Sequence, residues 1–83
     1  MRNDKTNPAE DMLAIGHRIR LLRNKKALTM EKMAETFGVS YQTVSKWEHG
    51  HAIPDFYNLR ALKKFFNVSS DYILYGEDFS IVA

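Results

Sequence analysis

The stretch TMEKMAETFGVSYQTVSKWEHG, residues 29–50, decides the fold because it predicts two short helices joined by a tight turn. Its first apolar residues are spaced at i, i+3, i+4 and i+7, as on one face of a helix of about two turns: Met30, Met33, Ala34 and Phe37. Gly38 follows, and glycine ends helices because it adopts the left-handed conformation without steric cost. Ser40 is then a good N-cap for the next helix, and Val39 before it can pack against Val44.

The second of these helices is expected to have a small apolar side and a polar outer face. Its inward residues are predicted to be Val44, Trp47 and Glu48. The outward residues all carry hydrogen-bonding groups and include no acid: Tyr41, Gln42, Ser45, Lys46 and His49. A helix with these two faces is suited to the major groove of DNA.

The composition predicts one small domain. The chain has 83 residues, of which 45% are hydrophobic, enough for a modest core. It has no cysteine, which excludes disulfides, thiol nucleophiles and thiolate metal sites. No apolar run is long enough to cross a bilayer, and the start lacks the apolar stretch of a signal peptide. We therefore expect a cytoplasmic protein.

Basic residues are concentrated in the middle of the chain. The formal net charge is only +2, but residues 13–75 hold ten lysines and arginines against five acids. The other acids lie toward the two ends. A basic body with acidic ends suits a polyanionic partner, although many helical domains carry solvated lysine faces.

Residues that typically begin or end helices divide the chain into an arm, five helices and a tail. Residues 1–11 are polar, contain Asn7-Pro8 and show no periodicity, so we expect a flexible arm. An all-α domain is predicted over residues 12–76, with helices over about 12–25, 30–37, 41–49, 56–66 and 70–75. Residues 77–83 would form a C-terminal tail that contacts a second copy. The sequence of helix end, left-handed residue, valine and serine cap occurs twice, at residues 37–40 and 66–69.

Many residues at fixed spacing resemble the phage-repressor and Cro-type helix-turn-helix family, the lambda-repressor-like proteins. The resemblance lies in Leu28-Thr29, Met33-Ala34, Gly38-Val39-Ser40, residues 43–48, Gly50 and Pro54, supported by Ile15-Gly16, Ile19, Leu22-Arg23, Leu59, Val68-Ser69 and residues 71–74. It extends over about residues 13–76. The resemblance implies a five-helix DNA-binding domain whose third helix lies in the major groove, usually as a homodimer.

Two positions depart from the family pattern. Met30 stands where the family commonly has a glutamine that grips a backbone phosphate, so phosphate binding there would depend on Thr29 and free helix amides. Ala27 stands where the family favours glycine. If its φ is positive, Ala27 carries strain of roughly 1 kcal/mol.

The proposed DNA contacts fall into two groups. Base reading is assigned to Tyr41, Gln42, Ser45 and Lys46. Glutamine can pair with adenine, lysine can donate to guanine or to a phosphate, and Tyr41 can stack on a thymine methyl or reach a phosphate with its hydroxyl. Phosphate contacts are assigned to Thr29, Ser40, Thr43, His49 and His51. For Tyr41, Gln42 and Lys46 the alternative is an ordinary solvated side chain, and Thr43 could instead only support its own helix. The absence of acid in the first turn of the third helix favours the DNA interpretation, since a carboxylate there would repel phosphate.

The resemblance also implies a structural ion pair between Arg23 and Glu48, tying the first helix to the third. Glu48 beside the core residue Trp47 would be expensive to bury without a partner.

Catalysis and cofactors are not indicated. We find no nucleophile–base pair, no phosphate loop and no recognisable pair of carboxylates, so the chain is not expected to be an enzyme. His17, His49 and His51 lack nearby cysteines and clustered acids, so neither a metal nor another cofactor is expected.

The function predicted is a sequence-specific, dimeric DNA-binding transcriptional regulator, acting as a repressor at a pseudo-palindromic operator. The dimer is suggested by a C-terminal excess of large apolar residues: Phe65, Phe66, Tyr72, Tyr75, Phe79, Ile81 and Val82. A protein-interaction module, such as the antitoxin of a toxin–antitoxin pair, is the alternative, because one fold can serve both roles.

Overall fold

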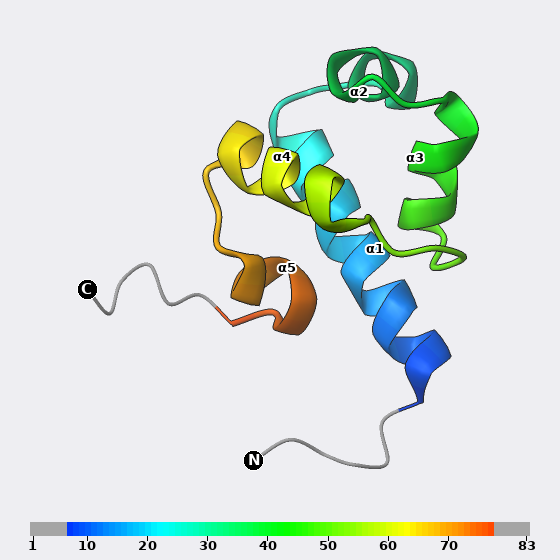
Figure 1. Ribbon diagram of the computed structural model, residues 1–83, viewed down its shortest axis with the longest axis vertical. Helices are drawn as coiled ribbons and strands as arrows, with labels where there is room; N and C mark the ends of the chain where they lie inside the picture. Colours follow the sequence, from blue (N-terminus) through cyan, green and yellow to red (C-terminus); the bar gives the residue numbers. More distant parts are fainter. Residues whose placement is uncertain (1–6, 78–83) are drawn as a thin grey trace.

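The computed structural model describes residues 7–77, and this part of the chain folds into five α-helices with no β-strand. They are α1 (Pro8–Lys25), α2 (Met30–Phe37), α3 (Tyr41–Glu48), α4 (Phe56–Phe66) and α5 (Ser70–Tyr75). Helix α1 runs through the middle of the molecule and contacts both α3 and α5, which lie to either side of it (Figure 1). The predicted all-α, five-helix fold is confirmed.

Side-chain caps begin every helix. In each case the cap oxygen accepts a hydrogen bond from a backbone N–H of the first turn, and the caps of α2 to α5 are those that the sequence predicts: Thr29, Ser40, Asp55 and Ser69. Three helices end in the left-handed conformation, at Gly38, Asn67 and Gly76. Local termination chemistry therefore sets most of the helix boundaries.

Helix α1 begins earlier than predicted. Asn7 caps it, with its Oδ1 accepting from the N–H of Ala9 at 2.7 Å, and Pro8 occupies the first turn, where its missing N–H costs nothing. Glu10 and Asp11 also lie in this turn, where the helix dipole favours acids. Residues 8–11 are thus helical rather than part of an arm, Asn7 is the cap before them, and residues 1–6 of that predicted arm lie outside the described residues.

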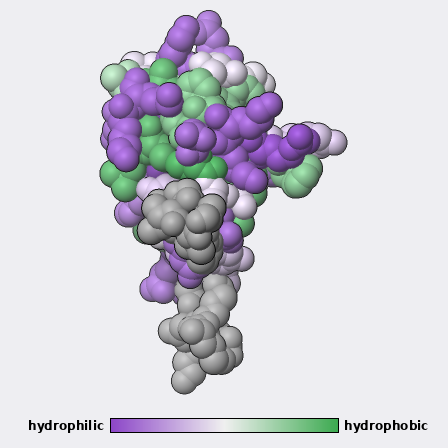
Figure 2. Space-filling view, turned by 90° about the vertical axis from the view of Figure 1, so that its left-hand side faces the viewer, coloured by the Kyte–Doolittle hydropathy of each residue, from purple (hydrophilic) through white to green (hydrophobic). Residues whose placement is uncertain are grey.

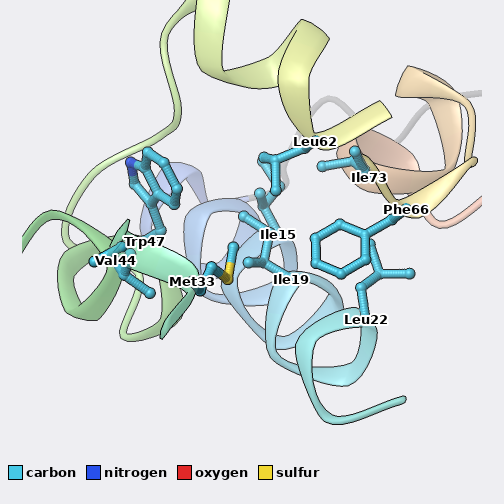
Figure 3. Close-up of a cluster of buried hydrophobic side chains, with 10 residues drawn as sticks. Ile15, Ile19, Leu22, Met33, Val44, Trp47, Leu62, Phe66 and Ile73 are labelled. Carbon is cyan, nitrogen blue, oxygen red and sulfur yellow. The ribbon is translucent and has the colours of Figure 1, made fainter. Parts of the chain in front are cut away.

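The core is a single cluster at the meeting point of all five helices (Figure 3). Ile19 of α1, Met33 of α2, Val44 of α3, Leu62 of α4 and Ile73 of α5 are each fully inaccessible to solvent. Because every helix contributes a residue to one cluster, displacement of any of them exposes apolar surface.

The C-terminal aromatic residues divide between core and surface. Phe66 is buried, but Phe65 is 37% exposed and packs edge-on against Phe37 and Phe66. Tyr75 is 53% exposed. On the side where the end of α4 and α5 lie, Figure 2 shows hydrophobic groups at the surface beside hydrophilic ones. Phe79, Ile81 and Val82 lie outside the described residues.

Candidate nucleic-acid interface

The junction between α2 and α3 satisfies its own backbone. The Gly38 N–H donates to the carbonyls of Ala34 and Glu35, and the Val39 N–H donates to Ala34 at 3.0 Å. On the far side, Ser40 Oγ accepts from the Thr43 N–H at 3.1 Å. Gly38, Val39 and Ser40 are the only residues between the two helices, and each of them takes part in one of these hydrogen bonds. The junction therefore fixes the angle between α2 and α3.

Helix α3 has the two faces that the sequence predicts. Its buried residues are Val44, Trp47 and Glu48. Of the four candidate base-reading residues, Tyr41, Gln42 and Lys46 are exposed and Ser45 is half-buried. No acid lies in the first turn, and Lys46 lies in the last. The helix therefore presents neutral and basic hydrogen-bonding groups to solvent.

The candidate phosphate residues do not form one cluster, since they lie at different helix ends. Thr29 caps α2, and its hydroxyl already accepts from the Lys32 N–H. Ser40 and Thr43 lie together at the start of α3, with their hydroxyl oxygens 2.9 Å apart. His49 and His51 follow the end of α3, with ring centroids 6.3 Å apart. The candidate phosphate residues at the two ends of α3 thus lie on either side of the candidate base-reading residues.

A buried carboxylate anchors α3 to α1. The Glu48 side chain is 0% exposed and accepts two hydrogen bonds from Arg23, 2.6 Å from Nε to Oε2 and 3.0 Å from Nη2 to Oε1. The ion pair expected between these residues is therefore present. The hydrogen bond to Glu48 raises the pKa of the Arg23 guanidinium above its ordinary value, and the negative charge of Glu48 acts in the same direction.

Two further contacts of the Arg23–Glu48 pair were not predicted from the sequence. Arg20 Nε lies 3.4 Å from Glu48 Oε1, and Arg23 Nη1 donates to the Leu28 carbonyl at 2.7 Å. The first could have been found, because Arg20 precedes Arg23 by three residues and so shares its helix face. The second depends on the path of the connection between α1 and α2, where Ala27 adopts φ 55°, as anticipated for a position that favours glycine.

A glycine lets α1 and α3 approach closely beside this anchor. A Cβ atom built on Gly16 would lie 2.2 Å from the Trp47 carbonyl oxygen and 2.8 Å from that of Glu48. Gly50, at φ 76°, makes a similar approach to the backbone of Leu13, where a Cβ atom would lie 2.8 Å from Cα. The end of α3 thus rests on the backbone of α1, which fixes its orientation. A glycine inside an otherwise helical pattern is the sequence signal for such a contact.

A search for other kinds of site covers residues 7–77 only. Within that range no group of three or more metal-ligating side chains comes together. None of the helices there combines the length and the hydrophobicity that crossing a membrane requires.

The helix-turn-helix family model matches residues 19–73, more than half of the chain. The transcriptional activator BcrR of Enterococcus faecalis is 37% identical over 71 residues, covering 86% of this chain and 35% of that protein. The transcriptional regulator DicA of Escherichia coli is 38% identical over 66 residues, covering 80% and 49%. The chain spans between about a third and a half of these curated relatives.

Among solved structures, the chain is similar to the c2 repressor of Salmonella phage P22 in complex with a synthetic operator. The TM-score is 0.71 and the identity 36%, covering 76% of this chain and 96% of that one. The resemblance to phage repressors, inferred from residue spacing, is confirmed.

Proposed function

Because this chain belongs to the helix-turn-helix family, we propose that it is a sequence-specific double-stranded DNA-binding transcriptional regulator. The observation that carries the proposal is the outer face of α3, which combines exposed Tyr41, Gln42 and Lys46 with a first turn free of acid. Anionic phosphate is attracted to such a face, and base edges can hydrogen-bond to it. The likeness to a repressor solved with its operator supports this assignment.

In this proposal α3 lies in the major groove. Gln42 pairs with an adenine edge, Lys46 donates to guanine or to phosphate, and Tyr41 and Ser45 complete the readout. Phosphates on either side contact Thr29, Ser40 and Thr43 at helix starts, and His49 and His51 after the end of α3.

We further propose that the protein binds as a homodimer to a pseudo-palindromic operator and represses transcription by occupying it. Exposed apolar groups support the dimer, among them Phe56 at 66%, Tyr57 at 76% and Tyr75 at 53%. A two-fold dimer presents its two reading helices about 34–36 Å apart, one turn of DNA.

Selection of bound duplexes from a random pool tests the proposal. The expected product is one sequence motif with two-fold symmetry, whose half-sites lie about 10–10.5 base pairs apart centre to centre. Recovery of a single asymmetric half-site would contradict the proposed homodimer but would still support DNA reading by α3. Recovery of no motif at moderate salt would contradict sequence-specific DNA binding and would favour the alternative of a protein-interaction module, such as an antitoxin.

A further inference from the structure

Two histidines follow the proposed reading face, and both are exposed. His49 caps the C-terminal end of α3, and His51 lies just past Gly50, with its backbone N–H bonded to the Lys46 carbonyl at 2.8 Å. Their ring centroids are 6.3 Å apart. Backbone hydrogen bonds therefore hold the chain that presents the two rings to the last turn of α3.

The hydrogen bonding of His49 determines where it takes up a proton. Its Nδ1 lies 2.8 Å from the Ser45 carbonyl oxygen, which can only accept, so Nδ1 carries the hydrogen in the neutral ring. The Ser45 hydroxyl lies 3.3 Å from the same atom. Proton uptake at Nε2 then creates a cation with a second N–H donor, while the bond to Ser45 keeps the ring in place.

The charges around the pair come from three directions. On α3 itself, Lys46 is exposed and the charge of Glu48 is engaged by Arg23. On the side of α1 that flanks the end of α3, helical spacing puts Glu10, His17 and Arg20. Beyond the loop, Asp55 accepts hydrogen bonds from Asn58. Of these acids, Glu48 and Asp55 already accept hydrogen bonds from other residues.

We propose that His49 and His51 form a phosphate clamp that tightens when they are protonated, so that acidification increases affinity for duplex DNA. The proposal rests on the proposed function, because it requires α3 to lie against DNA. Two charged rings this close repel each other and Lys46, and a DNA phosphate relieves that repulsion. Binding is then coupled to proton uptake, and linkage gives at most a tenfold gain in affinity per pH unit for each proton taken up.

The test measures affinity for a mixed-sequence duplex of about 24 base pairs, because phosphate contacts need no particular base sequence. Titrations run from about pH 8 to about pH 5, the range in which histidine changes charge. The wild type should bind at least about tenfold more tightly at the acidic end. Its log–log salt slope should also steepen by about 0.9 for each added phosphate contact.

Variants separate the two rings from other pH effects. His49→Gln with His51→Gln should reduce the acid gain to less than about twofold. His49→Lys with His51→Lys should bind tightly throughout, because lysine keeps its charge over the whole range. His17→Gln, which removes the exposed histidine of α1, should keep the full gain. Melting curves without DNA at each pH confirm that every variant is folded.

Two outcomes would overturn the clamp. Either the wild type binds equally well at both ends of the pH range, or the glutamine pair keeps the gain. Failure of the proposed function gives a different result, since no variant would then bind the duplex at any pH. The lysine pair makes this distinction clear, because it binds under every condition if α3 faces DNA.

Discussion

The junction between α2 and α3 and the junction between α4 and α5 use the same backbone chemistry. Gly38 and Asn67 end their helices at φ 67° and 56°, and Val39 and Val68 donate to the carbonyls of Ala34 and Lys63 at 3.0 and 3.1 Å. Serine caps then bond to the first turns at 3.1 and 3.0 Å. The chain therefore turns by the same means twice.

The helices that follow these junctions differ in what they present and in how they are held. Helix α3 has no acid in its first turn, whereas α5 has Asp71 there. Helix α3 is held to α1 by the buried pair of Glu48 and Arg23, whereas Arg18 holds α5 by donating to the carbonyls of Ile73 and Leu74 at 2.8 and 3.1 Å. Turn chemistry is thus the same before both helices, and the proposed reading helix α3 differs from α5 in its outer face and in its anchor.

The largest effect is expected from breaking the anchors. Arg23→Ala leaves the fully buried Glu48 carboxylate without its main partner, which should cost about 3–5 kcal/mol of unfolding free energy and abolish DNA binding with it. Arg18→Ala removes only hydrogen bonds from a charged donor to carbonyls, at about 1.5–3 kcal/mol. Urea unfolding followed by circular dichroism measures both.

A double variant sharpens this test. Arg23→Met with Glu48→Leu removes both charges and should recover most of the lost stability, because apolar residues can replace a buried ion pair at little cost. An Arg23→Ala variant with unchanged melting temperature and unchanged DNA affinity would contradict the role given to the pair.

The next effect concerns the close approach that α3 makes to α1. Gly16→Ala places a methyl group against the Trp47 carbonyl oxygen, and we expect a loss of about 1–3 kcal/mol or more as α3 is pushed outward. His17→Ala, at the exposed neighbouring position, should stay within about 0.5 kcal/mol. Thermal melting of the two variants compares them, and equal melting temperatures would refute the close contact.

Exchanging the first-turn charges tests function directly. Gln42→Glu should stabilise α3 by about 0.3–1 kcal/mol through the helix dipole. It should nevertheless weaken DNA binding by at least about 1–3 kcal/mol, because a base contact is lost and phosphate is repelled. Asp71→Asn should destabilise α5 by about 0.3–1 kcal/mol and leave DNA affinity unchanged. Fluorescence anisotropy on the selected operator gives the affinities, and equal losses in the two variants would argue against α3 as the reading helix.

The smallest effects belong to the left-handed positions. Gly38→Ala should cost about 1 kcal/mol from backbone strain alone, since nothing lies within 4 Å of the added Cβ atom. Asn67→Gly should cost nothing or stabilise by a few tenths of a kcal/mol, because glycine bears no strain there. Denaturant midpoints at unchanged slope would measure both, and a stabilised Gly38→Ala variant would contradict the assigned geometry.

Features that depend on neighbouring residues could be predicted from the sequence. The caps at Thr29 and Ser40 and the inward set of α3 follow from local hydrogen bonding and helical spacing. Features that depend on how helices meet could not. The bonds from Arg18 to the end of α5 join residues 55 and 56 positions apart, and the exposure of Phe65 depends on the position of α2. The start of α1 was a local error, because Asn7-Pro8 was interpreted as a break rather than as a cap followed by a favourable first residue.

The close contact at Gly16 bears on which operator sequences the protein would bind preferentially. With its backbone seated on that of α1 and its one buried acid held by two arginines, α3 has little freedom to slide or tilt. If α3 reads DNA as proposed, the DNA duplex rather than the helix must bend or twist to bring both half-sites into contact with the two reading helices. Base steps that bend or twist at low energy would then be preferred even where no side chain reaches them.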